Sequence, residues 1–426
     1  MRVMIEGQDL VAWTLSAALA STGCRVSVSA DRLPRDNQEV NEPDLLRLLD
    51  SQHQSGRLQT GYPDTRASLL VIGRDMGGFE SCCRYLEPYL SAALDDDGYL
   101  KVIALVQPLP LGTTDRLQQW LQDSGRGQVK VVYWPAFIQA GRALESLMRP
   151  ERILLGSCDE GAIQFMRQLL NPFNRSRDTL MVMPPKEAEL SKLAINGMLA
   201  TRVSFMNELA QLAADKGIDI EQVRQGIGSD TRIGFQYLYP GCGFGGQAFL
   251  KTLAQLSGEL EQRDTEGVSL LRSVCSINEQ QKDLLFQKLW RFYRADLAGK
   301  RVAIWGCAFK PNTASVEGSP ALTLVEALLA HDVELAVYDP RALPALRRHL
   351  GERAGVVYAD SPEQAAEGAD ALMLVTEWKE FWNLDMQALQ QRMRRPLLLD
   401  GRNIYDPAAM ELQGWTYSAV GRGVNL

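Results

Sequence analysis

Short apolar runs alternate with amphipathic stretches over the first 180 residues or so of the chain. The apolar runs are typical of buried strands, and the amphipathic stretches are typical of helices. Expected strands are residues 2–5, 25–28, 68–72, 101–106, 129–133, 153–156 and 179–182. Expected helices between them are residues 12–21, 44–52, 79–93 and 115–123. This order of strand, helix and strand predicts a doubly wound parallel sheet.

The middle of the chain has a different periodicity. Between residues 184 and about 295 no strand signal is convincing. Residues 186–216 and 266–293 carry apolar side chains at helical spacing, which predicts long helices. A glycine-rich stretch, residues 234–246, interrupts them.

Strand–helix alternation returns after residue 296. Expected strands are 301–305, 334–338, 371–375 and 396–399, and expected helices are 322–331 and 364–367. The predicted fold is therefore α/β, with two Rossmann-like doubly wound domains joined by a central all-helical domain. The expected boundaries are 1–183, 184–295 and 296–426.

Composition excludes several classes of protein. The 426 residues are 46% hydrophobic and 23% charged, as in globular proteins, and the net charge of −7 argues against nucleic-acid binding. No apolar run reaches membrane-spanning length, and the N-terminus lacks a signal-peptide core, so we expect a cytoplasmic protein. Seven cysteines without a CxxC pair and three scattered histidines predict reduced thiols and no metal site.

Several motifs, in order along the chain, resemble those of the UDP-glucose/GDP-mannose dehydrogenase family. They are KLAIN at 192–196, SFMNE at 204–208, DTRIG at 230–234, GCGFGG at 241–246, GCAFKPNT at 306–313, VYDP at 337–340, TEW at 376–378 and DGRNIYDP at 400–407. The resemblance covers essentially the whole chain and favours the UDP-hexose branch. It implies an NAD-dependent oxidation of the sugar C6 alcohol to the acid through a cysteine thioester. It also implies a homodimer formed by the central helices.

The positions that carry this chemistry in the family differ here. The nucleophile motif Gly-Gly-Ser-Cys-Phe-Pro-Lys-Asp reads GGQAFLKT, so Ala248 replaces the cysteine and Thr252 the aspartate. The loop that supplies a glutamate for hydrolysis has Ala136 and Ala140 in place of its two glutamates. Pro108 replaces a threonine that holds a catalytic water. A methyl group cannot form a thioester, so the resemblance with these departures predicts a catalytically inactive member.

The expected dinucleotide site is degenerate as well. The fingerprint G-x-G-x-x-G reads Gly7, Asp9 and Ala12 at its three defining positions. A carboxylate at the second position adds bulk and negative charge where the pyrophosphate approaches the helix N-terminus. The ribose-binding acid is expected at Ala30, and Asp31 comes one place later. NAD, the cofactor of the family, is therefore expected to bind weakly or not at all.

Positions that match the family's nucleotide-sugar ligands are largely kept. The resemblance implies that Lys192 and Asn196 contact the C6 group of the sugar, and that Arg232 reaches the sugar site of a neighbouring subunit. It places Tyr237, Gly243 and Gly245 in the loop around the sugar and base. It implies that Lys310 and Arg402 bind the diphosphate and the sugar. Each also has a simpler interpretation. Lys192 could be a solvated helix residue, Arg402 a surface ion pair with Asp400 or Asp406, and the glycines a tight turn.

Three hypotheses remain open at this point. The first is an inactive UDP-glucose dehydrogenase-like protein in polysaccharide or nucleotide-sugar metabolism, which binds a UDP-sugar or pairs with an active paralogue. The second is an active NAD-dependent dehydrogenase with altered chemistry, using Lys192 and Asn196. The third is a purely structural dimeric partner without a ligand. NADH formation separates the second from the others, and UDP-sugar binding separates the first from the third.

Overall fold

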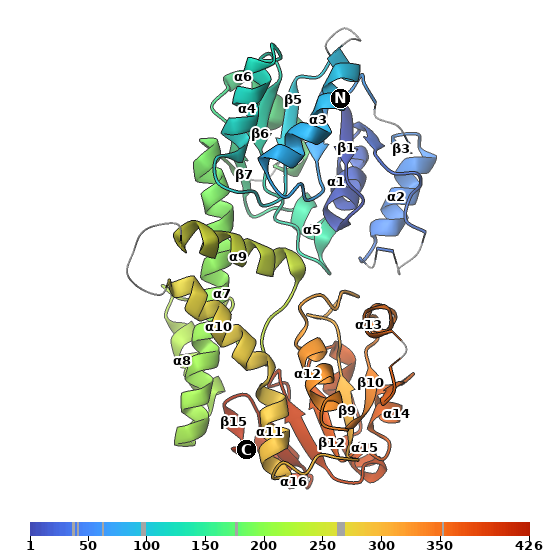
Figure 1. The fold of residues 1–426 in the computed structure, drawn as a ribbon, viewed down its shortest axis with the longest axis vertical. Coiled ribbons are helices and arrows are strands. Elements are labelled where there is room, and N and C mark those ends of the chain that lie inside the picture. Colours follow the sequence, from blue (N-terminus) through green and yellow to red (C-terminus); the bar gives the residue numbers. More distant parts are fainter. Residues whose placement is uncertain are drawn as a thin grey trace. The chain divides into compact units, whose positions relative to one another are not determined.

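The computed structural model describes residues 1–35, 39–40, 42–61, 64–94, 99–174, 178–261, 269–351 and 353–426. The chain forms two compact units, Met1–Ala194 and Ile195–Leu426. The long helix α7 (Pro185–Lys216) runs from the first unit into the second (Figure 1). None of the described helices is both long and apolar enough to cross a membrane.

The first unit is built on an eight-stranded sheet with the order β3-β2-β1-β4-β5-β6-β7-β8. Its strands are β1 (Arg2–Glu6), β2 (Arg25–Val28), β3 (Leu58–Thr60), β4 (Leu69–Ile72), β5 (Val102–Leu105), β6 (Lys130–Tyr133), β7 (Ile153–Gly156) and β8 (Leu180–Met183). Its helices are α1 (Leu10–Ser21), α2 (Leu45–Gln54), α3 (Phe79–Leu94), α4 (Thr113–Asp123), α5 (Ala143–Met148) and α6 (Glu160–Leu170), with the 3₁₀ turn η1 (Asn171–Phe173). All neighbouring strands pair in parallel except β6 and β7, which run antiparallel.

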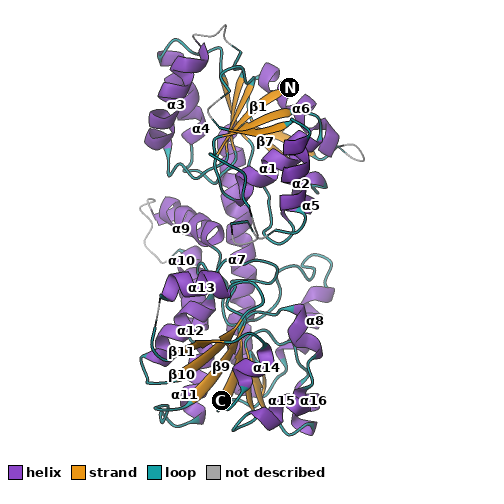
Figure 2. Ribbon diagram, turned by 90° about the vertical axis from the view of Figure 1, so that its right-hand side faces the viewer, coloured by secondary structure: helices purple, strands orange, loops and turns teal. Residues whose placement is uncertain are grey.

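Helices cover both faces of this sheet (Figure 2). Side chains from α1, α2 and α6 form one apolar cluster with alternate residues of the strands, and α3 and α4 form the other. Strands β4, β5 and β7 are buried at all four positions. Continuous apolar strands are the pattern that a parallel sheet covered on both faces requires.

The second unit contains the rest of α7, further helices and a seven-stranded sheet with the order β11-β10-β9-β12-β13-β14-β15. Its strands are β9 (Arg301–Trp305), β10 (Glu334–Tyr338), β11 (Val356–Tyr358), β12 (Ala371–Leu374), β13 (Leu397–Asp400), β14 (Thr416–Ala419) and β15 (Arg422–Gly423). Its other helices are α8 (Ile220–Ser229), α9 (Gln247–Glu261), α10 (Leu270–Lys282), α11 (Leu284–Phe292), α12 (Pro320–Leu329), α13 (Leu343–Leu350), α14 (Pro362–Ala366), α15 (Met386–Arg392) and α16 (Pro407–Leu412), with the 3₁₀ turn η2 (Lys379–Asn383). Among the described strands of this sheet, only β15, a two-residue strand, pairs antiparallel.

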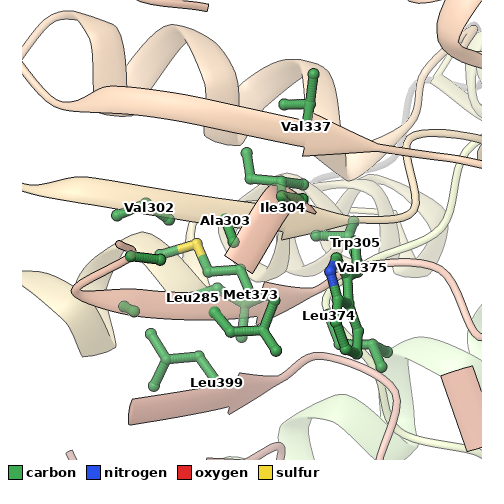
Figure 3. Packing of buried hydrophobic residues seen from close by; sticks show 14 of the residues in the cluster. Leu285, Val302, Ala303, Ile304, Trp305, Val337, Met373, Leu374, Val375 and Leu399 are labelled. Atoms are coloured by element: carbon green, nitrogen blue, oxygen red, sulfur yellow. The ribbon is translucent and has the colours of Figure 1, made fainter. Parts of the chain in front are cut away.

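The core of the second unit lies between this sheet and the helices that cover it. Figure 3 shows apolar side chains of β9, β10, β12 and β13 together with Leu285 of α11. Trp305 is fully buried, stacks on Phe381 and donates its indole N–H to the Pro362 carbonyl. The largest side chain of the core is therefore both packed and hydrogen-bonded.

The predicted α/β architecture is confirmed, with two mainly parallel sheets and long helices between them in sequence. The strands predicted at 25–28, 153–156, 301–305 and 334–338 coincide with β2, β7, β9 and β10. The predicted helix at 266–293 is two helices, α10 and α11, and residues 266–268 lie outside the described part. The division into domains 1–183, 184–295 and 296–426 remains a prediction.

Candidate functional site

The sheet of the second unit has a topological switch point between β9 and β12. Chain connections leave these two strands toward opposite sides, and ligands of open α/β sheets bind at the carboxyl ends of such strands. Lys310 follows β9, Glu377 follows β12 and Arg402 follows β13. The fold thus brings charged residues from three distant parts of the sequence to one edge of the sheet.

The loop after β9, which leads to Lys310, is held by a buried carboxylate. Asp339, after β10, accepts hydrogen bonds from the Cys307 N–H at 2.6 Å, the Ala308 N–H at 2.9 Å and the Trp378 indole N–H at 3.0 Å. Thr376 donates its hydroxyl to the Ala308 carbonyl at 2.6 Å. These contacts give the VYDP and TEW motifs a physical role, which is to fix the start of the Lys310 segment.

The glycine loop 241–246 packs closely against this edge of the sheet. A Cβ on Gly241 would lie 2.7 Å from Nη1 of Arg402, and a Cβ on Gly246 would lie 2.9 Å from Cε2 of Phe309, the neighbour of Lys310. A Cβ on Gly245 would lie 2.4 Å from the Gly318 carbonyl oxygen. The glycines are therefore needed for close backbone approach, and they bring the loop beside both predicted cations.

Amide side chains of two helices fix the same loop. Asn207 of α7 accepts from the Gly241 N–H at 2.8 Å, and Gln281 of α10 donates to the Gly241 carbonyl at 2.9 Å. Asn278 of α10 accepts from the Phe244 N–H at 2.8 Å and donates to the Phe244 carbonyl at 3.1 Å. The sequence analysis did not assign these roles, because the partners are more than thirty residues apart.

Arg402 is not a surface residue, and that interpretation is wrong. Its Nε lies 2.6 Å from the Val375 carbonyl oxygen and 3.3 Å from Oε2 of Glu377. Asp400 accepts from the backbone N–H of Arg402, so it is not the ion-pair partner of the guanidinium. The guanidinium is thus held at the sheet edge by Glu377 and a backbone carbonyl.

The remaining predicted ligands of this unit lie in the loops after α8 and β9. Arg232 is exposed and pairs with Asp230, with Nη2 2.6 Å from Oδ2. Tyr237 has a φ of 58°, and its ring lies 5.9 Å from that of Tyr239. Gly243 has a φ of 95°, and a Cβ there would meet the side chain of Lys282. Lys310 lies over the ring of Phe309, with Nζ 5.7 Å from the centroid.

The residue predicted to replace the family nucleophile lies in the first turn of α9. Ala248 is exposed there, and Thr252 one turn later donates its hydroxyl to the Ala248 carbonyl at 2.7 Å. Burial raises the pKa of the thiols of Cys242 and Cys275 above the ordinary value, and it raises the pKa of the Cys307 thiol well above it. All three thiols of this unit are therefore disfavoured as thiolates.

The loop between β1 and α1 in the first unit contains the degenerate fingerprint. Gly7 has a φ of 140°, and a Cβ there would lie 2.9 Å from the Arg74 N and 3.0 Å from the Cβ of Ala12. Ala12 is fully buried. The first and third fingerprint positions therefore keep their structural roles, the tight turn and the close packing of helix against strand.

The second fingerprint position is different, because Asp9 caps α1. Its Oδ1 accepts from the Ala12 N–H at 2.9 Å, and its Oδ2 accepts from Nε2 of Gln107 at 3.0 Å. Partial burial of the carboxylate raises its pKa, an effect that the backbone hydrogen bonds oppose and the nearby Asp75 reinforces. The N-terminus of α1, where the fingerprint would place a pyrophosphate, thus holds a carboxylate of the chain itself.

Two predicted residues flank this loop. Pro108 follows Gln107, whose side-chain amide also donates to the Gly73 carbonyl. Asp31 is exposed and lines an open pocket of about 410 Å³ after β2, together with Arg32, Arg35 and His53. Among the described residues, no three or more histidine, cysteine or acidic side chains are grouped as metal ligands would be.

Lys192 lies on α7 and is 9% exposed, so its interpretation as a solvated helix residue is wrong. Its Nζ donates to the Ala136 carbonyl at 3.2 Å and lies 4.4 Å from the centroid of Phe137. Burial, and to a lesser extent Arg152, lowers the pKa of Lys192 to about 8. Asn196, one helical turn later, is half-buried, and its side chain makes no hydrogen bond to a described residue.

Family models match two parts of the chain. Residues 186–280 match the central domain of the UDP-glucose/GDP-mannose dehydrogenase family, and residues 303–407 match its UDP binding domain.

Similar proteins extend over nearly the whole chain. A UDP-glucose 6-dehydrogenase of Pseudomonas aeruginosa is 37% identical to this chain, and one of Bacillus subtilis is 30% identical. Each match covers 99% of this chain and 98% of the length of the relative. The solved structure of a UDP-glucose dehydrogenase from Pyrobaculum islandicum has a TM-score of 0.81 at 27% identity, covering 95% of this chain and 94% of that one. The chain therefore belongs to the UDP-glucose/GDP-mannose dehydrogenase family.

Proposed function

We propose that this protein binds a UDP-sugar and does not carry out the four-electron oxidation of its C6 group. The observation that carries the proposal is Ala248, exposed in the first turn of α9 at the position of the family nucleophile. A thioester needs a thiolate, and a methyl group supplies none. The loss of this residue removes the covalent route from aldehyde to acid.

No other thiol of the second unit is suited to replace the nucleophile. Cys242 and Cys307 are fully buried, and Cys275 is half-buried against the apolar cluster of Ala200, Leu253 and Val274. Burial raises the pKa of all three, so the reactive thiolate is scarce at neutral pH. The aspartate that resemblance places at residue 252 is a threonine whose hydroxyl is used inside its own helix.

Weak or absent NAD binding is the second part of the proposal. The carboxylate of Asp9 accepts the Ala12 N–H, one of the groups that a helix N-terminus offers to a phosphate. Gln107 binds the other carboxylate oxygen. A pyrophosphate at this place would displace both hydrogen bonds and lie against a like charge.

Retention of a UDP-sugar is supported by the second unit. The glycine loop 241–246, Arg402 and the segment before Lys310 lie together at the switch point of the sheet and are fixed by Asn207, Asn278 and Asp339. Cations suit a diphosphate, and glycines allow a ligand to approach the backbone closely. The match of residues 303–407 to a UDP binding domain points the same way.

A dimer through α7 is also proposed, formed with a second copy of this chain or with an active paralogue. This helix has three exposed apolar residues at intervals of seven, Met198, Phe205 and Leu212. Their side chains are 63%, 51% and 53% exposed. Residues at this spacing lie on one helical face, and an exposed apolar stripe is typical of a protein interface.

A second function has its own support. The chain is similar over almost its full length to proteins named UDP-glucose 6-dehydrogenase, and it keeps the buried Lys192 one turn before Asn196. An active NAD-dependent dehydrogenase with altered chemistry, stopping at the aldehyde, would use these two residues. Production of NADH from a UDP-sugar distinguishes this function from the one proposed above.

Isothermal titration of the full chain with UDP-glucose, UDP-glucuronate and NAD tests the proposal. We expect a UDP-sugar to bind and NAD to give no measurable heat at micromolar protein. Lys310→Ala should weaken UDP-sugar binding by roughly 10- to 100-fold, because one charge-assisted contact to phosphate is lost. Lys216→Ala, at the exposed end of α7, is the matched control and should change nothing. If millimolar UDP-sugars give neither heat nor thermal stabilisation, the purely structural partner takes the place of this proposal.

A further inference from the structure

The amino ends of the strands in the second sheet carry a dense cluster of positive charge, the basic surface. It is formed by residues 291–301, which run from the end of α11 into β9, and residues 392–395, which run from the end of α15 toward β13. Its cations are Arg291, Arg294, Lys300, Arg301, Arg392, Arg394 and Arg395, and all but Lys300 and Arg301 are exposed. Asp296 is the one acid in these two segments. The candidate site lies at the carboxyl ends of the same strands, so the basic surface is at the opposite end of the sheet.

Contacts with one tyrosine bring the two segments together. Nζ of Lys300 lies 5.1 Å from the ring centroid of Tyr293, and the guanidinium carbon of Arg395 lies 5.8 Å from the same centroid. The Tyr293 hydroxyl donates to the Asp370 carbonyl at 2.8 Å, and Arg394 pairs with the Asp370 carboxylate at 3.5 Å. The cations of the basic surface are therefore neighbours in the fold as well as in the sequence.

Most of this positive charge is uncompensated. The cations that form no ion pair with a described residue are Arg294, Lys300, Arg392 and Arg395. The net charge of the whole chain is −7, so the basic surface is opposite in sign to the protein as a whole. A local excess of cations attracts a surface or ligand that carries many negative charges.

An exposed leucine lies at the same end of the sheet. Leu412, the last residue of α16, is 90% exposed. Four residues later Thr416, the first residue of β14, donates its backbone N–H at 2.8 Å to the carbonyl of Pro396, which follows Arg395. Figures 1 and 2 show α11, α15 and α16 at this end of the second unit. Cations beside an exposed apolar side chain are typical of protein surfaces that rest on a membrane.

We propose that the basic surface docks on an anionic lipid bilayer, with its cations against the headgroups and Leu412 at the boundary with the acyl chains. Anionic membranes attract polybasic clusters within about a Debye length of their surface. Headgroups above acyl chains complement both the spread of cations and the leucine, whereas an acidic peptide complements only the cations. In this orientation the carboxyl ends of the second sheet, with Arg402, face away from the bilayer.

Cosedimentation of the full chain with vesicles tests the proposal. The probes are vesicles of phosphatidylcholine alone and vesicles with about 30% phosphatidylglycerol, in about 0.1 M salt. We expect binding to the anionic vesicles only, and its loss in about 1 M salt. One cation near an anionic membrane contributes roughly a fivefold change in partition, so Arg394→Gln combined with Arg395→Gln should lower partition roughly 30-fold. Lys300→Gln should lower it roughly fivefold.

Matched variants separate charge from other effects. Arg394→Lys combined with Arg395→Lys keeps the charge and should keep the binding. Arg272→Gln combined with Lys379→Gln removes two exposed cations from α10 and η2, and it should also keep the binding. Leu412→Ser should weaken binding by a factor that does not depend on salt. Melting temperatures of all variants establish that they fold.

Several results would overturn the proposal. They are absence of binding to the anionic vesicles, equal binding to both kinds of vesicle, and binding that survives Arg394→Gln combined with Arg395→Gln. Binding of a fluorescein-labelled decaglutamate peptide without binding to vesicles overturns it as well, and assigns the basic surface to an acidic protein segment. Titration with UDP-glucose tests the proposed function separately, because Lys310 and Arg402 lie at the other end of the strands.

Discussion

Replacing Asp9 by glycine removes the carboxylate from the N-terminus of α1, and we expect the affinity for NAD to rise. Two effects contribute. The Ala12 N–H, which Asp9 binds at 2.9 Å, becomes available to a phosphate, and the like charge disappears. Loss of the cap itself costs little, since glycine is a tolerated N-cap residue and reduces helix stability by only a few tenths of a kcal/mol.

The size of the effect follows from the charge. Two unit charges about 4 Å apart repel by about 1 kcal/mol in water and about 4 kcal/mol at an effective dielectric constant near 20. Asp9 retains contact with solvent, so screening places the repulsion between these limits. A value of about 2 kcal/mol corresponds to roughly a 30-fold change in Kd.

Asp9→Asn separates charge from bulk. Asparagine keeps a cap acceptor for the Ala12 N–H and removes the charge, so its affinity for NAD should lie between those of wild type and Asp9→Gly. The assay is equilibrium dialysis or titration with NAD, and Asp123→Asn, at the exposed end of α4, is the control. A micromolar Kd for the wild type, or unchanged affinity in both variants, would refute the reasoning.

Two further variants probe other parts of the structure. Lys192→Met should raise the free energy of unfolding at pH 7 by about 3 kcal/mol, because the pKa of this buried amine falls from 10.5 to about 8 on folding. The cost of burying the charge is fully present below pH 8 and is relieved as the pH rises toward 10.5, so denaturant melts should show the stability gain of the variant shrinking over that range. A stability gain that does not depend on pH would contradict this origin. Phe205→Glu combined with Leu212→Glu should turn a dimer into a monomer in sedimentation velocity. Leu412→Glu, at a residue on α16 that is 90% exposed, is the control and should not. A wild-type chain that is monomeric at micromolar concentration would contradict the α7 interface.

Hydrophobic pattern was enough to place most of the buried strands, because a strand covered on both faces is usually a continuous apolar run. β7 and β9 coincide with their predicted ranges for this reason. β3 and β11 were missed, since each has only three residues and a mixed pattern of exposure at the sheet edge. β14 and β15 were missed as well, because TYSA is not an apolar run and β15 has only two residues. The helix predicted as 266–293 is two helices, because α10 ends at Asp283 and α11 begins at Leu284. The sequence did not reveal this break, because no proline or glycine marks it.

The candidate site was only partly visible in the sequence. Asp9 could be placed at a helix N-terminus because the fingerprint fixes its position, but its contact with Gln107 joins residues almost a hundred positions apart. The contacts of Asn207 and Asn278 with the glycine loop are also long-range. Burial of Lys192 was unexpected, because the helix pattern alone does not reveal that the loop of Phe137 covers it.

The most direct test of the central claim is the yield of NADH from UDP-glucose with saturating NAD, followed by absorbance in the wild type and in Ala248→Cys. The wild type lacks the thiol at residue 248 and has a carboxylate at the expected pyrophosphate position, so we expect absorbance to stay at background. Ala248→Cys should stay there too, because we propose that Asp9 weakens cofactor binding and that Ala136 removes a group for hydrolysis, separately from the nucleophile. Steady formation of two NADH for each UDP-glucose by the wild-type chain would contradict the claim.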